Sequence, residues 1–434
     1  MIKNVLIFPG GTEIAMEVWS SLRDCKDIAL FSASSAISNH APYVFANHFI
    51  VPDVHSKNWI EPLNEVISKN NIDFVIPCHD DVVLALAVNS NELNARIVSS
   101  PVATCRICRS KSKTYKTFRE LLPVPELYIS QDLSDIGFEM IKFPLFVKPD
   151  VGQGSQGANI VPDQETLKAL IKANSDLIVL EYLPGKEYTI DCFSDLKRGL
   201  LFCGGRERIR TRAGISMHSK PVDAVLNQTF REYATIISKC IDLRGAWFFQ
   251  VKEDKNGVLK LLEIAPRISG TMATHRVQGI NFPLLSIYES ELVKIEISQN
   301  NFDIEIDRAL INRYRHNITF DKVYVDLDDT LILKNKVNTK LVQFLYQCVN
   351  KTCKIVLITK TVNDLSTYLK KWRLESLFDE ILLLNKGESK ADYIDPENSI
   401  FIDDSFSERK EVSKRYGIPT FDCSMVELLL DDKI

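Results

Sequence analysis

The stretch from Leu261 to Gly270 constrains the fold more than any other part of the sequence. An apolar run carries one acid, Glu263, before Pro266 ends it and presents Arg267. Such a run is typical of a buried strand, and a buried carboxylate is costly unless it meets a cation. A glutamate that holds Mg²⁺ and an arginine that meets phosphate oxygens would together suit a metal-bridged polyphosphate. We therefore expect a sheet with an anion site at the end of this strand.

A predicted hairpin places a second polar side chain beside that acid. Residues 247–251 and 258–263 are two β-prone runs, and Asp254–Gly257 between them is a typical hairpin turn. Antiparallel pairing across this turn brings Gln250 close to Glu263. The site is therefore expected to draw on both strands.

Candidate phosphate contacts lie upstream. Residues 143–147 predict a strand with Lys148 at its end, and residues 150–157 follow as a loop with three glycines and a serine. Backbone N–H groups of such a loop can approach a phosphate closely, and a neighbouring lysine adds a point charge. A plain surface loop would look similar when taken alone. Lys113, in a Ser-Lys-Ser-Lys segment, is a further candidate cation.

Four arginines alternate with other residues along one later run, so all of them could face one side of a strand. They are Arg206, Arg208, Arg210 and Arg212. Like charges at this spacing repel one another unless anions lie between them. A solvated edge strand is the alternative explanation.

The first hundred residues alternate apolar strands with helical patterns, for example a helix behind the N-cap Thr12. This alternation predicts a parallel, Rossmann-like sheet. The Pro-Gly-Gly-Thr turn at residues 9–12 lacks the dinucleotide-binding glycine pattern and favours a plain turn. Asp80 and Asp81 follow a strand where open sheets bind ligands, although helix capping explains them equally well.

A separate set of acids begins where the strand 322–325 ends in Asp326 and Asp328. Two carboxylates spaced by two at a strand end project into one site. Another strand ends in the hydroxyl of Thr359, and Lys390 is a candidate cation, with Lys386 as the alternative. A third strand ends in two more acids that could bind Mg²⁺ with the first, Asp403 and Asp404.

Residues 1 to about 300 resemble the ATP-grasp superfamily, most closely its carbamoyl-phosphate-synthase-like branch. The resemblance implies a Rossmann-like pre-ATP-grasp domain (1–104), an ATP-grasp domain (105–300) and the cofactors ATP and Mg²⁺ or Mn²⁺. It implies phosphate contacts from two lysines and a covering loop, namely Lys113, Lys148, Gly154, Ser155 and Gly157. It further implies adenine contacts from Glu181 and Leu183, a ribose contact from Glu187, metal ligands Gln250 and Glu263, and phosphoryl stabilisation by Arg267. Ala265 replaces the family's usual asparagine and puts the second Mg²⁺ in question.

The C-terminal residues 320–434 resemble the haloacid dehalogenase (HAD) superfamily, after a last strand and connector over residues 301–319. The resemblance implies a Rossmann-like hydrolase in which Asp326 attacks phosphorus and Asp328 is the general acid and base. Thr359 would hold the phosphate, and Lys390 would neutralise charge at the nucleophile. The implied Mg²⁺ ligands are Asp326, Asp328, Asp403 and Asp404. The whole chain is thus expected to be an α/β and α+β multidomain protein.

Composition narrows the class of protein further. The net charge of −4 gives no reason to expect a nucleic acid or a membrane surface as partner, and no apolar stretch is long enough to span a bilayer. Ten scattered cysteines in a chain of 434 residues indicate reduced thiols and a cytoplasmic location. Cys105 and Cys108 have the spacing of half a zinc site, but no second pair follows.

The expected function is bifunctional: an ATP-dependent carboxylate–amine ligase and a Mg²⁺-dependent phosphatase. The expected partners are a small-molecule carboxylate, an amine or other acceptor, and a phosphorylated metabolite, with a homo-oligomer left open. One alternative is an ATP-grasp kinase with a separately acting phosphatase. The other is a regulatory module that binds nucleotide without turnover.

Overall fold

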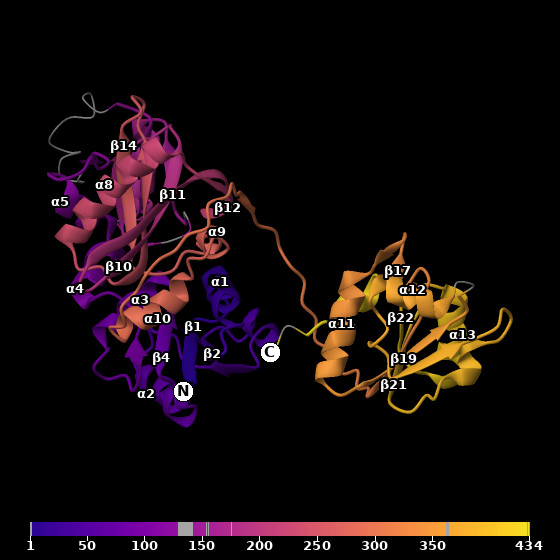
Figure 1. Cartoon of the computed structure of the whole chain (residues 1–434). Helices are drawn as coiled ribbons and strands as arrows, with labels where there is room; N and C mark the ends of the chain where they lie inside the picture. The colour runs from indigo at the N-terminus through magenta and orange to yellow at the C-terminus, as the bar shows by residue number, and fades with distance from the viewer. Residues whose placement is uncertain are drawn as a thin grey trace. The chain divides into compact units, whose positions relative to one another are not determined.

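The computed structural model describes residues 2–128, 142–152, 154, 156–174, 176–361, 364–431 and 433. The chain divides into two compact units, Met1–Leu310 and Ile311–Ile434, as the ribbon in Figure 1 shows. The expected mixed α/β multidomain class is confirmed, while the domain limits at residues 104, 300 and 319 stay predictions.

The first unit begins with a parallel five-stranded sheet in the order β3-β2-β1-β4-β5. Its strands are β1 (Lys3–Phe8), β2 (Ile28–Ser34), β3 (Asn47–Ile50), β4 (Phe74–Pro77) and β5 (Arg96–Ile97). Alternate residues of β1 face opposite sides: Val5 and Ile7 pack with helix α1 (Glu13–Leu22). Leu6 and Phe8 pack with the helices of the other side, α2 (Ile60–Lys69) and α3 (Asp80–Val88). Thr12 caps α1 as expected, and the cap of α3 is His79 rather than an aspartate.

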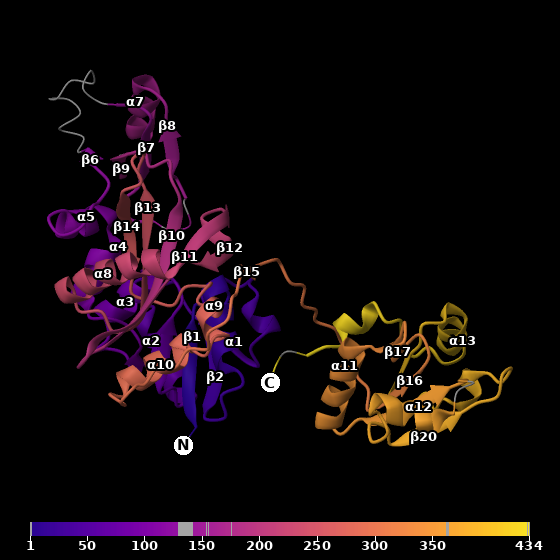
Figure 2. The ribbon, with the colours of Figure 1, turned by 45° about the horizontal axis from the view of Figure 1, so that its top comes forward.

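Two antiparallel sheets follow in the same unit (Figure 2). The smaller sheet has the order β6-β9-β7-β8, with β6 (Leu127–Tyr128), β7 (Leu145–Pro149), β8 (Asn159–Val161) and β9 (Leu177–Glu181). The larger sheet has the order β14-β13-β10-β11-β12-β15. Its strands are β10 (Glu187–Asp195), β11 (Gly199–Arg212), β12 (Ile215–Pro221), β13 (Gly245–Glu253), β14 (Leu259–Ala265) and β15 (Ile306–Asp307).

The larger sheet has one apolar and one polar face, because successive side chains alternate. Helix α8 (Ala224–Cys240) packs Phe230 and Ile237 against Ile190 and Phe249 on the apolar face. The polar residues Asp191, Arg206, Gln250 and Glu263 alternate with these apolar positions along their strands. The other α-helices that the described part of this unit contains are α4 (Val102–Arg109), α5 (Lys111–Phe118), α7 (Gln164–Ala173), α9 (Ala273–Arg276) and α10 (Phe282–Ser290).

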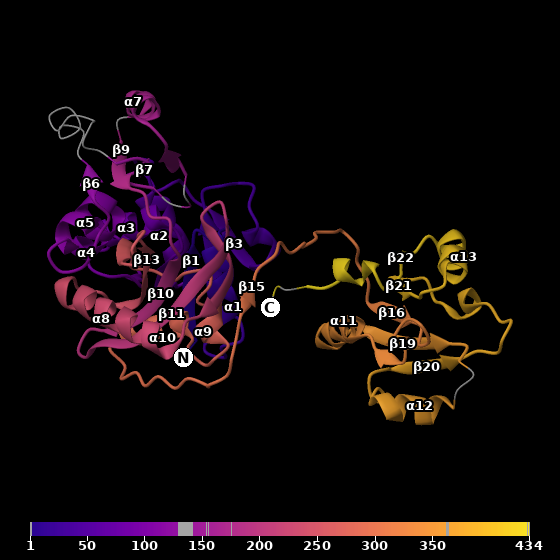
Figure 3. The same cartoon turned by 90° about the horizontal axis from the view of Figure 1, so that it is seen from above.

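The second unit is a parallel sheet in the order β20-β19-β16-β21-β22, covered on both faces (Figure 3). Its strands are β16 (Lys322–Val325), β19 (Lys354–Thr359), β20 (Glu380–Leu383), β21 (Ser399–Ile402) and β22 (Thr420–Phe421). Val323 and Val325 pack with helices α11 (Thr339–Asn350) and α12 (Leu365–Trp372). Tyr324 packs on the other side with α13 (Phe406–Tyr416) and the 3₁₀ turn η3 (Lys390–Tyr393). A small hairpin pairs β17 (Ile332–Leu333) with β18 (Lys336–Val337).

Among the described residues, no helix is long and apolar enough to cross a bilayer.

Candidate active sites

One cavity of the first unit is lined by both of its antiparallel sheets. It brings together most of the residues that the sequence singled out: Lys148, Gly154, Glu181, Leu183, Glu187, Gln250 and Glu263. Gln250 and Glu263 are paired residues of β13 and β14, as the predicted hairpin requires. Their adjacent amide and carboxylate oxygens are hard donors of the kind that Mg²⁺ prefers, so this pair fits a metal ion.

Lys148 is held in place at the cavity by a short hydrogen-bond chain. Its Nζ donates to the Tyr115 hydroxyl at 3.0 Å, and that hydroxyl donates to the carbonyl oxygen of Leu262 at 2.9 Å. Burial lowers the pKa of Lys148 to about 8, although Glu263 and Glu187 oppose that shift. A bound phosphate would restore the full charge of this ammonium group.

The glycine loop has a backbone that suits its residues. Gly154 and Gly157 have φ angles of +60° and +70°, a region that favours glycine. A side chain at position 157 would also lie 3.0 Å from the ring of Pro149. Ser155, predicted to contact phosphate, lies outside the described residues.

The other end of the cavity carries Glu181, Leu183 and Glu187. Glu181 Oε1 accepts from the backbone N–H of Glu126 at 3.0 Å and lies 3.1 Å from Lys260 Nζ. Leu183 is buried, and Glu187 lies at the start of β10. An apolar side chain beside acids can receive an adenine ring and a ribose.

Arg267 lies in an adjoining cavity that shares Gln250 and Glu263 with the first. Its Nε and Nη2 donate to Asp80 at 2.5 and 3.0 Å, and the guanidinium lies 5.1 Å from the ring centre of Phe248. Burial alone would raise the pKa of Asp80, but the paired Arg267 holds that pKa below its usual range. The ion pair therefore holds Arg267 at the wall of the adjoining cavity.

Three of the four alternating arginines are each paired with a carboxylate. Arg206 donates to Asp191 at 2.7 Å, Arg208 Nε lies 3.2 Å from Glu187, and Arg210 pairs with Asp307. Strand β11 lies between β10 and β12, so the explanation as an edge strand is wrong. Register shifts after Arg208 also end the regular alternation on one face.

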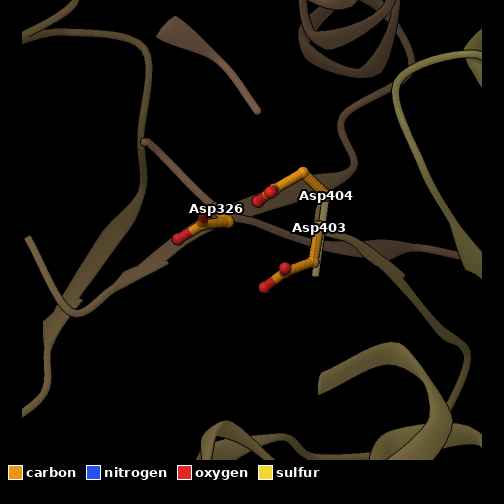
Figure 4. Close-up of side chains that lie close together, drawn as sticks. All are labelled: Asp326, Asp403 and Asp404. Atoms are coloured by element: carbon orange, nitrogen blue, oxygen red, sulfur yellow. The ribbon is translucent and has the colours of Figure 1, made fainter. Parts of the chain in front are cut away.

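The second unit has its own cluster of acids at the carboxyl edge of its sheet. Oxygens of Asp326, Asp403 and Asp404 all lie within 4.8 Å of one another (Figure 4). Lys390 Nζ donates to Asp326 at 2.6 Å and to Asp403 at 2.7 Å, and all three side chains are buried. Burial raises the pKa of Asp326 to about 6, which Lys390 opposes. Three converging carboxylates fit a divalent cation.

Two further predicted residues lie near this cluster in different ways. Thr359 is buried at the end of β19, which pairs in parallel with β16 and so ends at the same edge as Asp326. Asp328 is half-buried and lies outside the group of three acids found among the described residues. Thr330, to which the sequence assigned no role, donates to Asp404 at 3.2 Å and accepts from its backbone N–H at 2.9 Å.

The first unit is similar in sequence to known proteins. A family model for ATP-grasp proteins in the biosynthetic pathway with the Ter operon matches residues 173–310. The carbamoyl phosphate synthase large chain of Clostridium beijerinckii is 23% identical over 334 residues, which cover 70% of this chain and 30% of that protein. The arginine-specific large chain of Bacillus subtilis is 22% identical over 261 residues, 56% of this chain and 25% of its own. The chain thus spans less than a third of these relatives.

Solved structures show the same fold. Biotin carboxylase from Campylobacter jejuni superposes with a TM-score of 0.58 at 16% identity, over 68% of this chain and 72% of its own. An L-amino acid ligase from Bacillus licheniformis gives 0.53 at 17% identity, over 66% and 74%. The matched family model and these structures support an ATP-grasp fold for the first unit. ATP with Mg²⁺ or Mn²⁺, the expected cofactors, are those that ATP-grasp enzymes use.

The ATP-grasp cavity contains a different lysine from the one that the sequence indicated. Lys111 lines it and donates to the carbonyl oxygen of Gly152 at 3.0 Å, whereas Lys113 is exposed and absent from the lining residues. Ser110 caps α5, so that Lys111 and Tyr115 share the buried side of the helix. The spacing of Lys111 and Tyr115, four residues apart on one helix face, was visible in the sequence and could have identified Lys111.

Ala265 remains the clearest departure from the ATP-grasp pattern. It pairs with Phe248 across the hairpin and is 6% exposed within an apolar cluster. Its methyl group offers no ligand atom, so Gln250 and Glu263 are the pair that fits a metal here.

Proposed function

We propose that the first unit is an ATP-dependent ligase that activates a carboxylate and joins it to an amine or a similar acceptor. The carboxylate oxygen would attack the γ-phosphorus of ATP, with ADP leaving, and the acceptor would then displace phosphate from the acyl phosphate. The observation that carries this proposal is that two cavities meet at Gln250 and Glu263. One cavity suits a nucleotide, and the other suits an acid whose oxygen can reach the terminal phosphate.

The residues have separate roles in this proposal. Lys148 and Lys111 would contact the phosphates under the glycine loop, and Arg267 would stabilise charge on the transferred phosphoryl group. Glu181 and Leu183 would receive the adenine, and Glu187 the ribose. Gln250 and Glu263 would hold Mg²⁺, which would neutralise phosphate charge when bound.

An ADP-release screen across pairs of carboxylates and amines tests the ligase, with product masses measured for every active pair. A new amide together with free phosphate supports ligation. A stable phosphorylated product without an amide would identify a kinase instead. ATP binding without ADP formation across the whole panel would favour the regulatory alternative.

We propose that the second unit is a Mg²⁺-dependent phosphohydrolase of the HAD type. Asp326 would attack the phosphorus of a phosphoester while Asp328 protonates the departing alcohol. Water, deprotonated by Asp328, would then hydrolyse the aspartyl-phosphate and release phosphate. Lys390, held between Asp326 and Asp403, supports this role because it neutralises charge at the nucleophile.

Phosphate release from a panel of phosphoesters, with Mg²⁺ and after chelation by EDTA, tests the second activity. Dependence on Mg²⁺ is expected, because Lys390 can offset only one of the three converging negative charges. Phosphate release that is unaffected by EDTA would contradict the proposed metal site. We also infer a cytoplasmic location, since the described cysteines are free. We infer small-molecule substrates for the first unit, because an L-amino acid ligase shares its fold.

A further inference from the structure

The cavity beside the nucleotide site has a volume of about 390 Å³ and an unusual charge balance. Four arginines line it: Arg206, Arg208, Arg267 and Arg308. The first three are each paired with a carboxylate, namely Asp191, Glu187 and Asp80 respectively. Arg308 has no such partner among the described residues.

Arg308 follows the short strand β15, whose pairing with β12 carries it to the cavity. Its backbone N–H donates to Met217 at 2.9 Å. To the described residues its guanidinium makes one long hydrogen bond, from Nη1 to the carbonyl oxygen of Ser216 at 3.5 Å. No carboxylate within the described ranges lies within 4.0 Å of it.

The surroundings of Arg308 keep its guanidinium at the cavity wall. A Cβ added at Gly270 would lie 3.1 Å from Nη1 and 3.2 Å from Nη2, so a glycine there lets the guanidinium pack on the main chain. Burial lowers the pKa of Arg308, but an arginine stays charged at neutral pH. Most of its five donors are therefore free to meet a ligand.

We propose that Arg308 binds a second anionic group, a carboxylate or a phosphate, on the acid that the ligase activates. This proposal rests on the proposed ligase function and names its substrate class: small acids with two anionic groups. A planar guanidinium with unused donors matches the two oxygens of such a group. Arg267 and the phosphate-binding lysines serve the group that reacts, and Arg308 would select for the group that does not.

One acidic residue of the cavity provides a variant that should strengthen anion binding at Arg308. Glu13 begins helix α1 and lines the same cavity, and its charge lies close enough to affect Arg308. Glu17, which also affects Arg308, is engaged with Arg276 at 2.8 and 3.2 Å. An anion at Arg308 would be repelled by Glu13, so removal of Glu13 should strengthen its binding.

Calorimetry on the full chain, with Mg²⁺ and a non-hydrolysable ATP analogue, tests the proposal. The probes are succinate against succinamate, and O-phospho-L-serine against L-serine. The dianionic member of at least one pair should bind about tenfold tighter or more, and the active pair shows whether the site takes a carboxylate or a phosphate. Arg308→Gln should abolish the preference, Arg308→Lys should keep part of it, and Glu13→Gln should increase it.

Arg198→Gln is the matched control, because Arg198 is exposed and its carboxylate partner among the described residues is Asp195 on the same turn. An unchanged preference in Arg308→Gln, or no preference in the wild type, overturns the proposal. ADP release separates this failure from failure of the ligase. If ADP forms from singly charged acids and Arg308→Gln has no effect, the ligase proposal stands and the proposed anion site at Arg308 is wrong. If binding depends on Arg308 but no acid yields ADP, the anion site stands and the ligase proposal is wrong.

Discussion

Asp80 holds Arg267 through both of its carboxylate oxygens, at 2.5 Å from Nε and 3.0 Å from Nη2. The two residues follow strands of different sheets of the first unit and are far apart in sequence. Asp80 follows the strand β4 at the start of α3, and Arg267 follows β14. The N-terminal sheet thus contributes directly to the proposed ligase site.

Asp80→Asn should destabilise the first unit by about 1–3 kcal/mol, because it leaves a buried guanidinium without its charged partner. Urea unfolding at neutral pH measures this, since the low pKa of Asp80 keeps it ionised there. Asp24→Asn is the control: Asp24 is 79% exposed beside Arg23 and should have little effect. Equal effects of the two variants would contradict the importance of the Asp80–Arg267 pair.

Lys111→Ala should weaken ADP binding by about tenfold or more, whereas Lys113→Ala should leave it nearly unchanged. Lys111 lines the nucleotide cavity, and Lys113 is an exposed residue on the same helix, so the second variant controls for changes in the helix itself. Calorimetric titration with Mg²⁺-ADP distinguishes the two lysines. Loss of affinity in Lys113→Ala alone would restore the original prediction from the sequence.

Nucleotide affinity should fall as the pH rises above about 8, the pKa of Lys148 in the free protein. Burial favours the neutral amine, so binding to a phosphate above this pH requires uptake of a proton. The expected loss is up to about tenfold per pH unit, until the pKa of the nucleotide-bound lysine is reached. ADP affinity measured from pH 7 to 9.5 checks this.

Lys148→Arg is the control for that titration. Arginine keeps its charge across the whole range, so the variant should bind ADP with little dependence on pH. A wild-type affinity that stays constant up to pH 9.5 would show that Lys148 does not titrate as expected.

Local pattern was sufficient for some parts of the site and insufficient for others. Hairpin chemistry placed Gln250 beside Glu263, because the register of two paired strands follows from a short turn. The helical spacing from Tyr115 would have favoured Lys111 over Lys113 as the residue on the buried face. The contact between Asp80 and Arg267, and the position of Arg308 in the cavity, depend on how distant segments pack. No sequence period encodes such contacts.

Asp326→Asn should reduce phosphate release by at least about a thousandfold and leave ADP release by the first unit unchanged. An amide cannot serve as the nucleophile, whereas the variant fold should persist because Lys390 keeps Asp403 as its partner at 2.7 Å. Asp329→Asn is the matched control. Asp329 is an exposed neighbour with a φ of +56°, a conformation that asparagine tolerates well. Parallel assays of phosphate and ADP release, with a thermal melt for each variant, decide the outcome. Loss of both activities in a folded Asp326→Asn protein would contradict two separate sites.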